Sequence, residues 1–457
     1  MSSERYIPTK YDFRNYLQFY AGQMVSMLGS SIVSFTIVWY ITITYSNPIF
    51  LSIAYFCSVG IQVFAQPLGG VIADRFNRKK IIFTADTLIA IGTLMYMILF
   101  IFENQINKMS LLYIILAIVC FRAFVSSFQW PAGAAIIPLM VPKEQLSRLN
   151  GIRHISWGAI NIIGPAVGAV LYAAWPLNNI ILIDTVTYFV ALVPLFLLKI
   201  PKTDKDKKKE IEKTSKGSFG SEFKEGVKFL TATKGMVALF SIATFINFFE
   251  QPLWVLRPIF VDAFHGGTEK DLALIIMLGQ IGMFISGAVV IIKKTWKNKT
   301  RILMIALYVQ IAGYLISSIA PKGQMWGLFV GSIVMGFTFP FTNTMLNTIS
   351  QTIVPPEMQG RVSSILSTVC MAFNPIGMIA AGPLANAIGY MPLFVGTIIL
   401  GCISITVIWI FSKMRQIDPM VEEIEAKEKE IRKIQDDIVK LKIEMEEEKY
   451  PLPAIAD

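Results

Sequence analysis

Long apolar blocks recur along the whole chain and constrain its fold more than any other feature. Two of them read "MSLLYIILAIVCFRAFVSSF" and "MPLFVGTIILGCISITVIWIF", and each approaches the roughly 20 residues that cross a bilayer as a helix. Only 16% of the 457 residues are charged, whereas soluble domains carry about 25%. We therefore predict an all-α membrane protein that crosses the bilayer many times.

Apolar periodicity, punctuated by proline, glycine and charged residues, predicts twelve transmembrane helices. Their predicted extents are 15–44, 49–73, 80–103, 110–140, 151–175, 180–199, 236–263, 271–292, 301–320, 325–350, 362–387 and 392–412. With both termini cytoplasmic, the inner connections carry thirteen basic residues and the outer connections three. A missing or extra helix would scramble this positive-inside bias. We expect a multi-pass protein of the cell (plasma) membrane with both termini in the cytoplasm.

A polar stretch divides the predicted helices into two sets of six. The predicted organisation is an N-terminal half at 1–200, a cytoplasmic linker at 201–234, a C-terminal half at 235–415 and a cytoplasmic tail at 418–449. In the second part of the linker, Phe219, Phe223 and Val227 are spaced as on one face of a helix, which predicts a short amphipathic surface helix.

The two halves carry an internal repeat. The segment "VPKEQLSRLNGI" at 141–152 matches "VPPEMQGRVSSI" at 354–365 with an offset of 213 residues. Repeated six-helix halves are typical of secondary transporters, in which the substrate site lies between the repeats. The repeat therefore predicts two pseudo-symmetric halves and a transport function.

The tail has a different pattern from the rest of the chain. Ile424, Ile431 and Ile438 recur every seven residues, with Ile434 and Leu441 at intervening positions, which predicts a coiled coil. Lys427 weakens the apolar seam, so a solvated single helix is the alternative. A coiled coil here would either self-associate or bind a partner helix. The tail is acidic, although the net charge of the whole chain is +10. The excess of basic residues therefore lies in the rest of the chain, where it is suited to binding anionic lipid headgroups and needs no nucleic acid to explain it.

The segment 69–80, "GGVIADRFNRKK", carries a motif of glycine, acid and bases. With the twelve-helix repeat it resembles the major facilitator superfamily over residues 10–415, and most closely the drug-exporter branch that includes macrolide and siderophore exporters. The residues that fit the family's loop motif are Gly70, Asp74, Arg75, Arg78 and Lys79. Asn77 replaces a glycine of the motif, and we expect it to keep the turn because asparagine tolerates a left-handed backbone.

The resemblance implies that this loop is a gate. Asp74 ends one predicted helix, and another should begin near Gln359 or Gly360 with a partial positive charge at its N-terminus. In the family, such docking holds the cytoplasmic side closed in the outward-facing state. The alternative is a loop that only fixes topology, which explains the bases but not the acid.

The segment 151–169, "GIRHISWGAINIIGPAVGA", resembles the family's exporter motif on its fifth helix. The matching residues are Gly151, Gly164, Pro165 and Gly168, whereas Ile160 and Ala169 depart from the motif. Small residues and a proline suit a hinge-like packing face, and the motif implies export rather than uptake. Ordinary close packing of helices is the alternative.

Ionisable side chains inside the predicted spans are candidates for proton coupling, because charges in hydrocarbon usually face a cavity or a partner. Arg122 matches the family's arginine on the fourth helix, which implies that it tunes a carboxylate. Glu250 is our first candidate for the carboxylate that binds a proton or a cationic substrate, and Asp184 is the second. Asp86 is a further candidate. A structural ion pair between Glu250 and Arg257 is the alternative.

Aromatic and amide side chains on the central helices are candidates for the wall of a substrate cavity, although each is also a candidate for simple packing. They are Gln23, Trp39, Gln129, Trp130, Asn161, Asn247, Trp254, Asn343 and Asn374. A large, aromatic and sparsely polar cavity would favour bulky amphipathic compounds.

These features favour a secondary active transporter that exports small amphipathic molecules by proton antiport with alternating access. A proton-coupled symporter that imports a nutrient is one alternative, and a non-transporting sensor or scaffold acting through the tail is another. The chain lacks the phosphate-binding loop of an ATP-driven pump and any catalytic constellation of a membrane enzyme. We expect no cofactor, metal or nucleic acid, and as partners the bilayer, a small-molecule substrate and protons.

Overall fold

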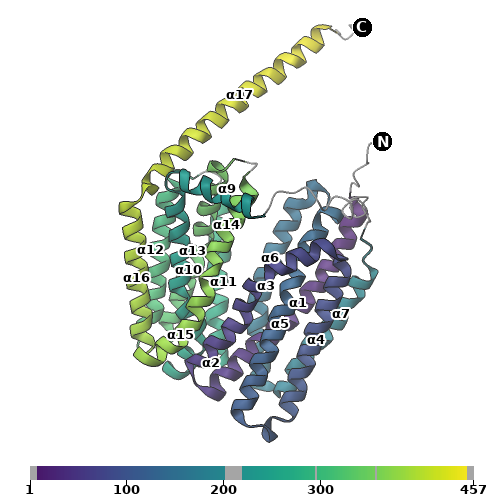
Figure 1. The fold of residues 1–457 in the computed structure, drawn as a ribbon, viewed down its shortest axis with the longest axis vertical. Coiled ribbons are helices and arrows are strands. Elements are labelled where there is room, and N and C mark those ends of the chain that lie inside the picture. Colours follow the sequence, from purple (N-terminus) through teal and green to yellow (C-terminus); the bar gives the residue numbers. More distant parts are fainter. Residues whose placement is uncertain (1–7, 201–218, 294–295, 356–357, 450–457) are drawn as a thin grey trace, which may run out of the picture.

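The computed structural model describes residues 8–200, 219–293, 296–355 and 358–449, which fold into long helices (Figure 1). The first part of the chain forms α1 (Lys10–Tyr45), α2 (Pro48–Tyr55), a π-helical turn (Phe56–Gly60), α3 (Ile61–Arg75), α4 (Arg78–Ile101), α5 (Lys108–Met140), α6 (Leu146–Ala174) and α7 (Leu177–Leu197). Short 3₁₀ turns at Glu103–Gln105 and Lys143–Gln145 join some of them.

The second part of the chain has a similar succession of elements. It comprises α9 (Phe219–Ala232), α10 (Met236–Ile259), a π-helical turn (Phe260–Phe264), α11 (Glu269–Ile292), α12 (Lys299–Ser318), α13 (Trp326–Ile353), α14 (Gln359–Ala372), α15 (Asn374–Ile388), α16 (Tyr390–Phe411), a 3₁₀ turn (Lys413–Gln416) and α17 (Ile417–Lys449).

Twelve helical segments of the described chain are long and apolar enough to cross a membrane, which confirms the predicted number. Most of their ends lie within five residues of the predicted ones, but the fifth segment begins at Lys143 instead of 151 and the eleventh at Thr368 instead of 362. Local side chains explain several of these ends. Thr9 and Asp12 form a capping box at the start of α1, and Thr268 and Asp271 form another at the start of α11. Asn107 caps α5 by accepting a hydrogen bond from the backbone N–H of Met109.

The eleventh span differs from the prediction of one helix at 362–387. The structure has two helices, because α14 ends at Ala372 and α15 begins at Asn374, with Phe373 between them. Pro375 is the second residue of α15. In a continuous helix its ring would clash with a carbonyl of the preceding turn, and it has no N–H to donate to that turn. The span therefore consists of two segments that meet at Phe373.

The spanning helices pack in two groups along the chain. Helices α1 and α3–α7 contact mainly one another, as do helices α10–α16, whereas α2 contacts α15 most. The two groups meet where α2 lies against α15 and where α6 lies against α11. Figure 1 shows that their ribbons diverge toward the end of the molecule that carries α9 and the start of α17. We call this end the terminal side and the other end the opposite side.

Two further helices lie on the terminal side. The predicted surface helix is present as α9, which contacts α10 and α14. Val227 and Leu230 of α9 line an apolar groove together with Phe240 of α10 and Ile365 of α14. The side chains of Phe219 and Phe223 lie outside the described part of the structure. The tail forms one long helix, α17, which projects away from the bundle (Figure 1).

The contact between α2 and α15 depends on a glycine. A Cβ atom added to Gly382 would lie 2.5 Å from the carbonyl oxygen of Pro48 and 2.6 Å from Cα of Ile49. Because these neighbours are backbone atoms, they cannot rotate away as a flexible side chain does. Only glycine therefore lets α15 lie this close to the start of α2.

Gly382→Ala is expected to push α15 away from α2 and to lower the unfolding free energy by about 1–3 kcal/mol, the usual effect of overpacking. The measurement is the thermal midpoint of the purified protein in detergent. Gly396→Ala on α16 is the matched control, because a Cβ there meets no atom within 4 Å. Equal midpoints for the two variants would contradict the close approach of α15 to α2.

Candidate functional site

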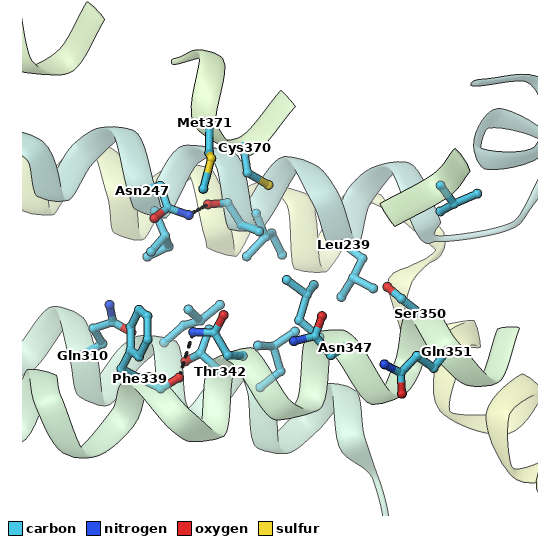
Figure 2. A pocket seen from close by; sticks show the side chains of 18 of the residues that line it. Leu239, Asn247, Gln310, Phe339, Thr342, Asn347, Ser350, Gln351, Cys370 and Met371 are labelled. Carbon is cyan, nitrogen blue, oxygen red and sulfur yellow. Dashed lines mark hydrogen bonds between the residues drawn. The ribbon is translucent and has the colours of Figure 1, made fainter. Parts of the chain in front are cut away.

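A cavity of about 390 Å³ lies within the C-terminal group of helices, between α10 and α13 (Figure 2). Helix α12 closes one side, and α14 and the start of α15 contribute further residues. The wall combines apolar side chains with a set of polar ones, which are Asn247, Glu250, Gln310, Thr342, Asn343, Asn347, Ser350, Gln351, Gln359 and Asn374. A largely apolar cavity with a few convergent polar groups is the usual form of a small-molecule site.

Glu250 is the acidic residue on this wall. It lies in the second half of α10, where its Oε1 accepts a hydrogen bond of 2.6 Å from Nε2 of Gln310 on α12. Among the described side chains no ion pair joins Glu250 to Arg257, the partner that the sequence offers seven residues further on. The geometry thus places a carboxylate beside an amide within a membrane-spanning helix.

Several buried polar atoms at this cavity have no hydrogen-bond partner in the described protein. They are Oε1 of Gln310, Oγ of Ser350 and Oδ1 of Asn374. Gln310 is only 5% exposed. Buried polar atoms are normally satisfied by protein, water or ligand. The cavity therefore presents hydrogen-bond acceptors, together with the Glu250 carboxylate, to whatever fills it.

A second polar cluster lies inside the N-terminal group. Arg122 on α5 forms an ion pair of 2.9 Å with Asp184 on α7, and both are largely buried. Thr93 of α4 and Ser30 of α1 donate to the two oxygens of Asp184 at 2.6 and 2.7 Å. Nη1 of Arg122 also donates to Thr93 at 2.8 Å. One carboxylate thus joins four helices through charge-assisted hydrogen bonds.

Asp86 forms a separate buried centre on α4. It accepts a hydrogen bond of 3.0 Å from Nε2 of Gln23 on α1 and another from Nε2 of Gln129 on α5. Its partners are neutral amides, whereas the partner of Asp184 is an arginine. The four predicted coupling residues are thus divided between two places, with Asp86, Arg122 and Asp184 in the N-terminal group and Glu250 in the C-terminal group.

The structure brings only some of the predicted cavity residues together. Asn247, Asn343 and Asn374 line the C-terminal cavity. Trp39 does not reach it, because its side chain is 2% exposed within an apolar cluster and acts in packing. Gln23 and Gln129 hold Asp86 instead.

The three remaining predicted cavity residues also lie away from this wall. Trp130 lies under the guanidinium of Arg153, 5.0 Å from its ring centre. Trp254 packs edge-on against Tyr55. Asn161 donates to the backbone carbonyl of Trp157 within α6. Each has a local contact that accounts for its position.

Gln310 is the polar residue of the cavity that sequence reasoning missed. It lies in the apolar run "MIALYVQIAG" of α12, where a lone amide costs free energy unless it is hydrogen-bonded. The position of a lone amide within an apolar span was the sequence signal that could have identified Gln310 as a functional residue. Its partner, Glu250, is sixty residues away in the chain, so sequence alone could not pair them.

The loop between α3 and α4 differs in one respect from the prediction. The expectation of a left-handed Asn77 is wrong, because its φ is −65°. Its side chain instead caps α4 by accepting hydrogen bonds from the backbone N–H groups of Lys79 and Lys80. Asparagine is a preferred N-cap residue, which explains why it serves here without a glycine-like backbone.

Lys79 of the predicted gating motif has a structural role. Its Nζ donates to the carbonyl oxygens of Phe196 and Leu198 at 2.8 and 2.7 Å, at the C-terminal end of α7. A cation is favourable at this negative end of a helix. Arg75 is exposed at the end of α3, Arg78 is the first residue of α4, and Gly70 has open space beside it.

The partner of Asp74 remains a prediction, because its side chain lies outside the described part of the structure. The same holds for the side chain of Arg361, close to the expected docking point. The helix that was expected to begin near Gln359 does begin there, as α14.

The glycines of the predicted exporter motif lie along the contact of α6 with α1. A Cβ at Gly168 would lie 3.0 Å from the ring of Phe35 and 3.3 Å from the carbonyl oxygen of Ile32. Gly164 lies closer still to its neighbour, the side chain of Ser31, whereas Gly151 has open space around it. Pro165 is buried within α6, which continues past it. The small residues thus permit close packing of α6 on α1.

No group of three or more His, Cys, Asp or Glu side chains that could hold a metal ion occurs in the described part of the chain. The buried acids are instead held by amides, hydroxyls and one arginine. Ionisable groups placed inside spanning helices in this way are typical of proteins that move solutes or protons across membranes.

This arrangement of helices and buried charges is that of a membrane transporter, and the chain belongs to the Major Facilitator Superfamily, whose family model matches residues 19–378. Macrolide efflux protein A of Streptococcus pyogenes is 28% identical over 414 residues, which cover 89% of this chain and 96% of that protein. Enterobactin exporter EntS of Escherichia coli O1:K1 / APEC is 24% identical over 79% of this chain and 83% of that protein.

Solved structures support the fold. A bacterial homologue of the iron transporter ferroportin, in an inward-facing state, matches with a TM-score of 0.66 at 15% identity, covering 86% of this chain and 98% of that one. The nucleoside transporter NupG matches with the same score at 14% identity and the same coverage. The protein is therefore a multi-pass transporter, and the expectation that it is no enzyme is confirmed by its family.

Arg122→Ala is expected to lower the unfolding free energy by about 3–5 kcal/mol, because it leaves the Asp184 carboxylate buried without its cation. The measurement is thermal unfolding in detergent. The double variant Arg122→Met, Asp184→Asn removes both charges and should recover most of the loss. A double variant as unstable as the sum of its two single changes would show that the pair is not coupled.

Proposed function

We propose that the protein is a secondary active exporter that moves small amphipathic molecules out of the cell in exchange for protons. The observation that carries this proposal is the position of Glu250, a carboxylate on the wall of a largely apolar cavity with no ion-pair partner among the described residues. The similarity to macrolide efflux protein A and to an enterobactin exporter supports the outward direction.

In this proposal the two groups of helices are related halves that rock against each other. The terminal side is cytoplasmic, because the predicted inner connections carry most of the basic residues. The contacts of α2 with α15 then close the extracellular side, and the cavity is reached from the cytoplasm. Rocking of two repeats is the usual form of alternating access, although the cavity of this protein lies within the C-terminal group and not between the two groups.

Glu250 can couple the two fluxes because it can hold either a proton or a cationic group of the substrate, but not both. A charge in a membrane-spanning segment needs a partner or a cavity, so the Glu250 carboxylate is suited to binding either a proton or a cation. A cationic amphiphile replaces the proton on the cytoplasmic side, and a proton from outside replaces the substrate after rocking. Asp86 and the pair of Asp184 with Arg122 are secondary candidates for the proton path.

The cavity suits a substrate that has both an apolar body and hydrogen-bonding groups. Apolar residues such as Leu239, Ile246 and Phe339 form much of the wall, and unpartnered acceptors lie at Gln310 and Asn374. A relative named for macrolide efflux makes a macrolide the first compound to test.

Import of a nutrient by symport is the less favoured alternative. A small polar nutrient would be expected to meet several closely spaced charges, whereas the wall of this cavity carries the single acidic residue Glu250 among the lining residues described. The glycine motif on α6 also resembles that of exporters.

Glu250→Gln should abolish transport driven by a pH gradient and should also slow the exchange of labelled for unlabelled cationic substrate, because the amide keeps its size but can hold neither a proton nor a cation. The measurement is flux of a macrolide and of hydrophobic cations in proteoliposomes. Asn343→Asp, which adds a carboxylate to the same wall, tests whether position 250 is special.

Each result of this experiment assigns a role to Glu250. Loss of gradient-driven transport with unchanged exchange of cations would make Glu250 a proton carrier that does not bind the substrate. Unchanged rates for both would overturn the antiport mechanism. Restoration of gradient-driven flux in Glu250→Gln by Asn343→Asp would show that the depth of the carboxylate matters more than its helix.

The gate proposed for the cytoplasmic side involves Asp74 and the N-terminus of α14. When the halves close on that side, the carboxylate at the end of α3 would dock on the first backbone N–H groups of α14, near Gln359. A helix N-terminus is favourable for a carboxylate by about 0.3–1 kcal/mol. The adjacent bases would hold the loop at the headgroups.

Asp74→Asn should lower the transport rate severalfold with normal expression and insertion, because the amide keeps the shape but loses the charge. Initial rates in vesicles, normalised to protein amount, are the measurement. Lys80→Gln is the matched control, since Lys80 is an exposed base of the same loop. If both variants transport at the wild-type rate, the loop serves topology alone.

A further inference from the structure

The base of α17 is fixed to the bundle. Oδ1 of Asp418 accepts hydrogen bonds from the backbone N–H and the hydroxyl of Thr300 at 2.8 and 2.7 Å, which caps the start of α12. Lys299 forms an ion pair of 2.8 Å with Glu425. Ile417 and Val421 are buried against the C-terminal group. The direction in which α17 leaves the bundle is therefore set by the first two turns.

Beyond these turns the helix has no neighbour among the described residues, although its apolar face continues. Ile424 is still partly buried, but Ile431, Ile434, Ile438 and Leu441 are each about half exposed. A lone amphipathic helix in water gains little from such a face, and isoleucine is only a moderate helix former. Burial of each of these side chains would be favourable, so the face is suited to a partner.

The charges beside this face favour one kind of partner. With Ile431 and Ile438 at the a positions of the heptad, the g positions hold Glu430 and Asp437. The sequence places Gln435 and Lys442 at the e positions. In a parallel pair of α17 helices, Asp437 of one copy faces Lys442 of the other, and Glu430 faces the neutral Gln435.

An antiparallel pair of the same helices would be unfavourable. Its flanks would bring g positions opposite g positions, so that Glu430, Asp437 and Glu444 would repel one another. Copies inserted in one membrane share the same orientation, which favours the parallel arrangement for two helices that both point away from the membrane. Confinement to the bilayer also raises the effective concentration of a second copy.

We propose that the exposed part of α17 pairs in parallel and in register with α17 of a second copy of this chain, so that the protein is a dimer held on its terminal side. The apolar seam runs from Ile431 through Ile434 and Ile438 to Leu441, and Asp437 selects the partner through Lys442. The dimer is independent of the substrate and of the coupling ion.

The test is oxidative cross-linking of the full-length protein reconstituted in vesicles. Ile438→Cys at an a position should give a disulfide-linked dimer on a non-reducing gel. Asp436→Cys, on the far face at an f position, is the matched control and should give only the background of the wild-type protein. The four native cysteines, Cys57, Cys120, Cys370 and Cys402, lie on spanning helices and set that background.

Exchange of the two charges distinguishes specific pairing of α17 helices from non-specific association of their apolar faces. In the Ile438→Cys protein, Asp437→Lys should slow dimer formation by about fivefold or more, as expected when two surface attractions become repulsions. Adding Lys442→Asp should restore the rate. Both variants carry the same change beside the cysteine, so only the charge pairing differs between them.

The proposal is overturned if Asp436→Cys cross-links as readily as Ile438→Cys, if the products are adducts with other proteins or higher oligomers, or if no dimer forms. Failure of Lys442→Asp to restore the rate would overturn the parallel register.

Discussion

The structure depends on the absence of hydrogen-bonding water in the hydrocarbon core of a bilayer. Every backbone group there must be paired within its own segment, so the spans are helices. The same constraint acts on side chains, because a charge in hydrocarbon is tolerated only beside a partner or a cavity. Asp184 meets it with Arg122, Asp86 with two amides, and Glu250 with an amide and a cavity. These three solutions differ in how readily the carboxylate can change its state.

The twelve spans could be predicted because each needs about 20 apolar residues and ends at a residue that disfavours the membrane. Pro375 in the sequence indicated the break in the eleventh span, but proline is tolerated in many membrane helices, and six other spans contain a proline inside a helix. Asn77 could not be assigned fully from sequence either. Asparagine indicated a turn, but it is compatible both with a helix cap and with a left-handed backbone.

The site was only partly predictable. The position of Glu250 follows from one acid in an apolar run, whereas its pairing with Gln310 joins helices sixty residues apart and depends on how α10 packs on α12. Sequence alone could not separate the cavity residues Asn247, Asn343 and Asn374 from Trp39, which packs in the core, because amides and aromatic residues occur in both places. The packing of neighbouring helices decides between these roles, and it is a property of the whole fold.

The close approach at Gly382 has a consequence for the response of the protein to its surroundings. In the proposed alternating access this contact would be a barrier made largely of backbone and apolar surface, so its strength should change little with salt or pH. A latch built on Asp74 and a helix end is electrostatic, and ions screen it. The two ends of the molecule would then be held shut by forces of different kinds, and ionic strength would shift the balance between the two orientations of the transporter.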